Sequence, residues 1–164
     1  MGIEFQVTEI LPGTPEHVFH ALTDLEAAAH WMPGFVAIER VGEVRQGLGM
    51  RWRETRRMRG SEATEEFEVT HYHPPSHLSM RIDGSKGTSG RGTYAFDYRL
   101  APRVGGTEVR MTGRIDGLLP AMLRWMEPLL GGMFKRMCGK ELRALARHLG
   151  RARHAPTPAA AAET

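Results

Sequence analysis

Two consecutive segments in which apolar and polar residues alternate carry the side chains best suited to chemistry. The segments, residues 47–59 and 62–73, flank Gly60 and Ser61, which are typical of a two-residue hairpin turn. A carboxyl group in apolar surroundings has a raised pKa and can donate or accept a proton, and a guanidinium beside it can polarise a carbonyl oxygen. Alternation places four polar side chains on the apolar face of this predicted hairpin, namely Glu54, Arg56, Glu65 and His71. Three of them, Glu54, Arg56 and His71, are the candidate catalytic residues.

The same four side chains also have a purely structural interpretation, which the pattern favours. A turn centred on residues 60–61 places Arg56 opposite Glu65. Arg56 can then pair with Glu65, or with Glu54 two residues away on the same face, and so satisfy a charge that would be costly to bury alone. A β-bulge that shifts one strand by a single residue would instead move polar side chains from this face to the other.

The eight histidines and the single cysteine do not indicate a metal site or an activated nucleophile. His71 and His73 lie two residues apart on one predicted strand, but no third ligand has suitable spacing, so we expect neither a metal nor a cofactor. Cys138 falls inside a helical pattern and is interpreted as a small buried hydrophobic residue. The Gly/Ser loop at 84–92 lacks the Gly-Lys-Ser/Thr ending of a phosphate-binding loop, and we predict a flexible hairpin tip there.

The elements that must position these residues begin with a strand at residues 3–11, where apolar and polar side chains alternate. Thr14 and Pro15 then form a helix start, with a side-chain cap followed by proline at the first helical position. We expect two short helices before about residue 31, followed by about six consecutive strands that end near Ile115. Antiparallel strands with one apolar face need a cover, and the remaining chain must supply it.

That cover is a long amphipathic helical segment at residues 119–149. Its predicted buried stripe is rich in Met, a flexible residue that is common at surfaces accepting varied partners, although Met also fills ordinary cores. Pro128 should break the helix, which predicts a short helical piece before about residue 127 and the main helix after it. Residues 151–164 are rich in Ala and Pro without apolar periodicity, so we expect a disordered tail after a single domain at residues 1–150.

Composition limits the function classes. The chain has 164 residues, 41% hydrophobic and 25% charged, as expected for one globular domain with a real core. Its net charge is +3, but acids and bases are mixed along most of the chain, which argues against a dedicated nucleic-acid surface. No apolar run is long enough to span a membrane, and the N-terminus does not have the pattern of a secretory signal. We therefore expect a cytoplasmic monomer or homodimer.

The order of elements resembles the helix-grip fold of the START/Bet v 1-like (SRPBCC) superfamily, and especially its bacterial polyketide cyclase/dehydrase-like branch. The resemblance covers roughly residues 3–149 and rests on short motifs in the expected order: TPEHVF at 14–19, LTDL at 22–25, WMPG at 31–34, YHPP at 72–75 and GTEV at 106–109. It implies an α+β fold in which a curved antiparallel sheet of about seven strands wraps around the long C-terminal helix, with two short helices after the first strand.

The resemblance also implies an internal apolar cavity that holds a lipid-like or polycyclic aromatic molecule. Strand and helix periodicity independently supply candidate wall residues, although for each residue taken singly a packed core is the favoured interpretation. The candidate ligand-binding residues are Trp52, Phe67, Val69, Met80, Ile82, Tyr94, Phe96, Met111, Met126, Met133 and Met137.

Three functions remain open on this basis. The first is a carrier or sensor that binds a small hydrophobic ligand without transforming it. The second is a polyketide cyclase/dehydrase-like enzyme that uses Glu54, Arg56 or His71 to move a proton during ring closure and dehydration. The third is a protein-interaction module, which would show a contiguous exposed apolar patch in place of a cavity.

Overall fold

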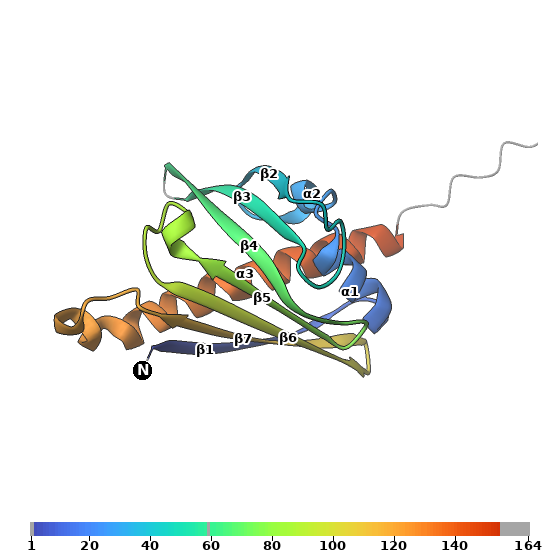
Figure 1. Ribbon diagram of the computed structural model, residues 1–164. Coiled ribbons are helices and arrows are strands. Elements are labelled where there is room, and N and C mark those ends of the chain that lie inside the picture. The colour runs from blue at the N-terminus through green and yellow to red at the C-terminus, as the bar shows by residue number, and fades with distance from the viewer. Residues whose placement is uncertain (1, 59, 155–164) are drawn as a thin grey trace, which may run out of the picture.

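The computed structural model describes residues 2–58 and 60–154 (Figure 1). Within this part of the chain, seven strands form one antiparallel sheet in the order β1-β7-β6-β5-β4-β3-β2. The strands are β1 (Ile3–Leu11), β2 (Phe35–Val41), β3 (Arg51–Met58), β4 (Ser61–His73), β5 (His77–Asp83), β6 (Thr93–Arg103) and β7 (Gly106–Asp116). The helices are α1 (Pro15–Thr23), α2 (Ala28–Trp31) and α3 (Glu127–His154), with short 3-10 helices η1 (Gly84–Lys86) and η2 (Ala121–Met126).

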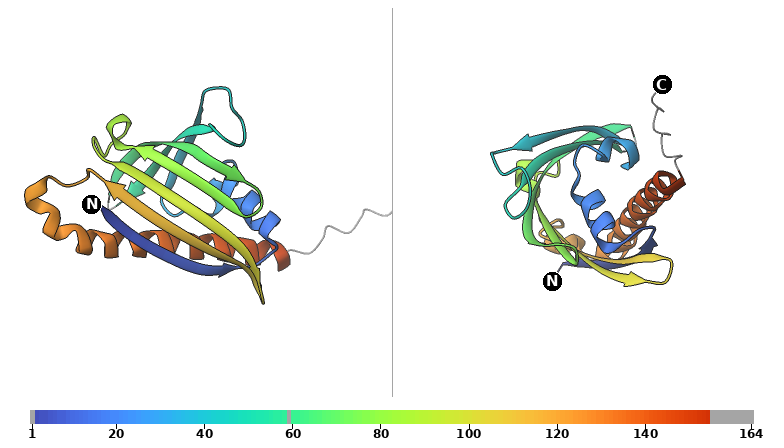
Figure 2. Two further views of the ribbon diagram at one scale, coloured as in Figure 1. Left: turned by 60° about the horizontal axis from the view of Figure 1, so that its bottom comes forward. Right: turned by 90° about the vertical axis from the view of Figure 1, so that its right-hand side faces the viewer.

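The sheet curves around α3, and α1 and α2 lie near one end of that helix (Figure 2). This arrangement confirms the predicted α+β helix-grip fold. α3 lies against β1, an edge strand of the sheet, and Gly131 of the helix lies beside Ile3 of the strand. The inner face of the sheet and the inward face of α3 share one hydrophobic core, whose most deeply buried members include Leu11, Val18, Leu78, Val109 and Leu145.

Local sequence chemistry explains where the helices begin. The Thr14 side chain accepts a hydrogen bond from the His17 N–H and caps α1, as predicted. The sequence predicts the second short helix at residues 25–30, whereas α2 has only four residues and begins at Ala28. The Asp24 carboxylate accepts hydrogen bonds from the N–H groups of Glu26 and Ala27, and residues 25–27 therefore form a turn.

The C-terminal segment divides where Pro128 predicts. η2 ends at Met126 and α3 begins at Glu127, so Pro128 lies in the first turn of α3. The N–H groups of a first turn have no acceptor within the helix, and proline at this position therefore costs no helical hydrogen bond. α3 runs to His154, beyond the predicted domain end at residue 150. The rest of the predicted tail, residues 155–164, lies outside the described residues.

Two details of the sheet differ from the sequence-based prediction. The β3–β4 hairpin closes with Met58 paired to Ser61, so Arg56 lies opposite Ala63 and not opposite Glu65. This register differs from the predicted one by two residues, and each side chain of β3 consequently keeps its predicted face. Further along β4, an irregularity between Val69 and His71 shifts the pairing with β5 by one residue.

The ring of Phe5 on β1 occupies the space above Gly113 on the neighbouring strand β7, and this contact yields a stability test. A Cβ on Gly113 would lie 2.2 Å from Phe5 Cζ, and the Phe5 ring is fixed by its stack on Phe134, with ring centroids 6.2 Å apart. Gly113→Ala should therefore lower the free energy of unfolding by about 1–3 kcal/mol.

Gly132 supplies the matched control, because a Cβ there meets nothing within 4 Å. Gly132→Ala should raise the free energy of unfolding by about 1 kcal/mol through helix propensity alone. Urea denaturation of both variants measures the two effects. Equal effects of the same sign would contradict this packing of Phe5 against the sheet.

Candidate functional site

Three charged side chains meet between the inner face of the sheet and α3. Glu54 on β3 is 4% exposed, and its carboxylate accepts hydrogen bonds from Trp52 Nε1 at 3.3 Å and from Arg56 Nε. Arg56 also donates from both Nη atoms to the two carboxylate oxygens of Glu141 on α3, each at 3.0 Å. The guanidinium of Arg56 therefore bridges the sheet and the helix, with a carboxylate on either side.

The electrostatics of this cluster are set by two carboxylates that share one cation. Burial raises the pKa of Glu54, and the nearby charge of Glu141 raises it further, while Arg56 and the hydrogen bond from Trp52 act in the opposite direction without cancelling the shift. Burial alone would lower the pKa of Arg56, but the charges of Glu141 and Glu54 outweigh it and raise that pKa. With both acids ionised, the cluster carries one net negative charge.

The groups around the cluster are apolar or weakly polar. Trp52 stacks on Phe67 with ring centroids 5.1 Å apart and planes 6° from parallel. Tyr98 on β6 is buried, and burial together with the charge of Glu141 raises the pKa of its hydroxyl. Burial and the same carboxylate raise the pKa of Cys138 to about 12, so this thiol is not an activated nucleophile.

Most of the predicted wall residues face this interior. Six belong to the buried core, namely Trp52, Val69, Met80, Ile82, Tyr94 and Met111, and Phe67 and Phe96 are partly buried against it. On α3 the prediction was less accurate. Met133 is 39% exposed on the outer side of the helix, and Phe134 packs against the core instead, between Phe5 and Tyr94. Met126 and Met137 are half-buried.

The predicted polar residues separate into different places. Arg56 pairs with Glu54, as one of the two alternatives predicted, but not with Glu65. Glu65 Oε1 instead accepts hydrogen bonds from the backbone N–H and hydroxyl of Ser89, at 2.8 and 2.6 Å. The 84–92 loop, predicted to be a flexible hairpin tip, is thus hydrogen-bonded to β4, where the Thr88 N–H also donates to the Thr64 carbonyl.

His71 does not join the cluster, contrary to the alternation of β4. The irregularity after Val69 moves His71 to the outer face, where it is exposed and its ring lies 4.0 Å from that of His77. His77 in turn contacts the Asp97 carboxylate at 2.5 Å, and the Ser79 hydroxyl donates to the same oxygen at 2.8 Å. The Ser79 and Asp97 oxygens approach the same nitrogen of His77, and this outer group therefore lacks the order of a nucleophile–base–acid triad.

Glu141 and Tyr98 are the residues of this site that the sequence analysis missed. A usable signal existed for Glu141, which is the one acidic residue between positions 128 and 152. It lies three residues after Cys138 and four before Leu145, both on the buried stripe of the helix. An acid beside the apolar face of an otherwise basic helix needs an internal partner.

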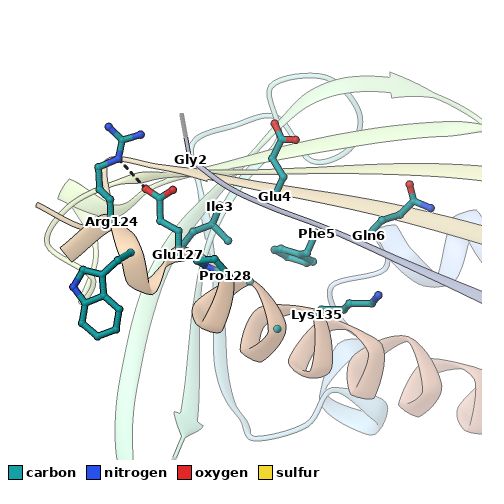
Figure 3. A pocket seen from close by; sticks show the side chains of 12 residues that line it. Gly2, Ile3, Glu4, Phe5, Gln6, Arg124, Glu127, Pro128 and Lys135 are labelled. Carbon is teal, nitrogen blue, oxygen red and sulfur yellow. Dashed lines mark hydrogen bonds and ion pairs between the residues drawn. The ribbon is translucent and has the colours of Figure 1, made fainter. Parts of the chain in front are cut away.

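Two surface hollows lie elsewhere, at the junction of β1 with the start of α3. The larger one is about 550 Å³ and is lined by residues 2–6 together with side chains of η2 and α3, among them Arg124, Glu127 and Lys135 (Figure 3). The Arg124 Nε donates to Glu127 at 3.3 Å across its rim. A second hollow of about 250 Å³ adjoins it beside residues 115–121. Neither is lined by any of the predicted wall residues.

Metal binding and membrane insertion receive no support from the described residues. Within residues 2–58 and 60–154, no group of three or more His, Cys, Asp or Glu side chains is arranged to hold a metal ion. In the same residues, no helix has both the length and the apolar character needed to cross a membrane.

Removing the central cation should destabilise the fold far more than removing its neighbour. Arg56→Met leaves Glu54 and Glu141 without their shared partner, and we expect a loss of about 3–5 kcal/mol in the free energy of unfolding. Arg57→Met breaks only the exposed pair with Glu62, at 2.7 Å, and should cost at most about 1 kcal/mol. Urea denaturation compares the two variants. Equal losses would show that the cluster does not tie the helix to the sheet.

The raised pKa of Glu54 predicts a specific pH dependence. Between the ordinary glutamate pKa of 4.5 and the higher pKa in the folded protein, the folded state binds more protons at this site than the unfolded state. The contribution of Glu54 to stability therefore falls as pH rises through this window, by at most about 1.4 kcal/mol per pH unit. Glu54→Gln removes the effect, and its stability relative to the parent protein should rise over the same window. Parallel stability curves would contradict the raised pKa.

Several solved structures of other proteins are similar to this structure over most of the chain. The protein TTHA0849 from Thermus thermophilus has 18% sequence identity and a TM-score of 0.73, over 91% of this chain and 98% of that one. The protein Ara h 8.0201 has 16% identity and a TM-score of 0.69, over 90% and 97%. DynU16, from the dynemicin biosynthetic locus, has 18% identity and a TM-score of 0.64, over 93% of this chain and 49% of that one.

These solved structures share the fold of this protein, but at such low identity they carry no further information about its chemistry. A search of curated proteins finds no match. A family model described as "Polyketide cyclase / dehydrase and lipid transport" matches residues 2–150, which include the whole sheet and nearly all of α3. The chain therefore belongs to the polyketide cyclase/dehydrase and lipid transport family.

Proposed function

We propose that this protein binds a small, mostly apolar molecule between the inner face of the sheet and α3, as a carrier or sensor. The observation that carries the proposal is the Glu54–Arg56–Glu141 cluster. It is a hydrogen-bonding group set among aromatic and aliphatic side chains, which is the composition typical of sites for apolar ligands with one polar end.

Partial exposure of the cluster supports a binding role over a purely structural one. The side chain of Arg56 is 19% exposed and that of Glu141 is 23% exposed, whereas Glu54 behind them is 4% exposed. The aromatic rings of Phe67 and Phe96 are likewise only partly buried. A ligand that covers these surfaces would remove apolar area from water and could reach the oxygens of Glu141.

The charge of the cluster suggests which polar end the ligand carries. Arg56 uses three of its five N–H donors on the two carboxylates, whereas each carboxylate accepts only two hydrogen bonds out of about four possible. Most of the spare hydrogen-bonding capacity of the cluster therefore lies at carboxylate oxygens, which only accept. A ligand hydroxyl or amine would find an acceptor there. A ligand carboxylate would instead meet two like charges in a region of low polarity.

Three ligands that differ only in the polar end test this proposal: decan-1-ol, decylamine and decanoate, each measured by native mass spectrometry at neutral pH. We expect the alcohol and the amine to bind, and decanoate to bind at least about tenfold more weakly. The net charge of +3 would favour decanoate at the protein surface, and surface attraction therefore cannot produce the expected order.

Variants of the cluster locate the effect. Glu54→Gln combined with Glu141→Gln leaves Arg56 as the remaining charge and should reverse the preference towards decanoate. Glu62→Gln, a surface carboxylate paired with Arg57, should change nothing. If the parent protein binds none of the three ligands, the binding proposal fails. If it binds decanoate as tightly as decylamine, the binding proposal stands and only the assignment of the carboxylates as the polar anchor fails.

Acid catalysis of ring closure is a second candidate function, and the raised pKa of Glu54 favours it. A carboxyl group that remains protonated to higher pH can donate its proton to the oxygen of a ligand carbonyl. At the same time the ionised Glu141 would take a proton from a second carbon of the ligand, and the resulting carbanion would attack the carbonyl carbon. Return of the proton from Glu141 to the new hydroxyl, with loss of a second proton from the attacking carbon to Glu54, would release water and restore both groups. Glu54→Gln separates the two candidates, because glutamine can still accept a hydrogen bond from a ligand but has no acidic proton to transfer. Loss of turnover with retained binding would favour the enzyme.

A further inference from the structure

The side of α3 that faces away from the sheet has a pattern that the proposed binding site does not use. Residues three or four apart lie on the same face of a helix. The buried residues Cys138, Leu142, Leu145 and Leu149 define the inward face. The opposite face is exposed, and we call it the outer stripe. It consists, in order, of Leu129, Met133, Arg136, Lys140, Arg143, Arg147 and Arg151.

The outer stripe has a single sign of charge over most of its length. Glu141, the one acid between residues 128 and 152, points inward and is paired with Arg56. Among the stripe cations, Arg143 contacts Glu9 of β1 at 2.9 Å, while its side chain remains 53% exposed. From residue 129 to residue 151 the stripe extends about 33 Å at 1.5 Å per residue.

The start of the stripe is apolar and lies beside more exposed apolar side chains from η2. Leu129 is 71% exposed, Trp125 is 75% exposed and Met122 is 82% exposed. η2 and the first turns of α3 project beyond the end of the sheet (Figures 1 and 2). Large apolar side chains gathered at one exposed corner of a domain indicate a contact surface.

We propose that the outer stripe and η2 dock on the surface of an anionic phospholipid membrane. Met122, Trp125 and Leu129 would enter the interfacial layer, and the cations from Arg136 to Arg151 would lie over the headgroups. Tryptophan favours this boundary because its ring is apolar and its N–H is polar. No described helix can span a bilayer, and the association is therefore peripheral.

The same pattern argues against other occupants. A second copy of this chain, docked about a two-fold axis on the stripe, would place cations against cations. A nucleic acid would match the charge but offers no apolar layer to receive Leu129 and Met122. A membrane surface is both uniformly anionic and apolar beneath its headgroups.

Co-sedimentation with vesicles tests the proposal, using phosphatidylcholine alone and phosphatidylcholine mixed with an equal amount of phosphatidylglycerol. We expect binding only to the mixed vesicles, with a blue shift in the fluorescence of Trp125. Lys140→Glu combined with Arg147→Glu should weaken that binding at least about 25-fold, or about fivefold for each cation removed. Trp125→Ser combined with Leu129→Ser should weaken it and abolish the blue shift.

Arg91→Glu combined with Arg103→Glu is the matched control, because it changes the net charge by the same amount at two exposed positions outside α3. It should leave vesicle binding within about twofold of the parent protein. The proposal is overturned if the mixed vesicles are not bound or if the control weakens binding as much as the stripe variant. Concentration-dependent dimerisation abolished by Trp125→Ser would also overturn it, in favour of a second copy. Circular dichroism confirms that each variant is folded.

Discussion

The rest of this structure depends on one ion-paired contact across the interior, in which Arg56 on β3 holds Glu141 on α3 with two hydrogen bonds of 3.0 Å. α3 lies against β1 at one edge of the sheet. On the opposite side, the curved sheet carries Glu54 and Arg56 on its inner face. The guanidinium therefore joins parts of the chain that are 85 residues apart, and it does so among apolar side chains.

A contact of this kind is an expensive way to hold a helix, because each buried charge loses its hydration and a well-packed apolar group of similar size is often as stabilising. A second use of the charges, besides holding the helix, would account for this cost. Two carboxylates around one guanidinium leave acceptor oxygens available, and burial together with the charge of Glu141 keeps the pKa of Glu54 raised in spite of Arg56. Both properties suit a site that receives the polar end of an otherwise apolar molecule, and the second also suits proton transfer.

Much of the fold could be predicted from the sequence, because alternation and helical spacing report burial directly. The inner-face positions of Glu54 and Arg56 are confirmed even though the hairpin register differs by two residues, because such a shift preserves the face. His71 could not be placed in this way, because one irregularity in β4 moves every later side chain of that strand to the opposite face of the sheet. Met133 was assigned to the wrong side of α3 because Met residues at helical spacing do not reveal which stripe is buried. The pairing of Arg56 with Glu141 depends on how the helix crosses the sheet, which local periodicity does not contain.

The three tryptophans of this protein occupy distinct places, and NMR of their indole N–H groups tests the central claim most directly. Trp52 Nε1 donates to Glu54 inside the cluster, whereas Trp125 is 75% exposed on η2. A Trp52→Phe variant assigns the interior resonance. If a ligand binds at the cluster, titration with decylamine shifts the Trp52 resonance and leaves that of Trp125 unchanged. A shift of Trp125 with no change at Trp52 would contradict the account, because it would place the ligand in the surface hollow beside η2 and leave the charged cluster as a structural contact alone.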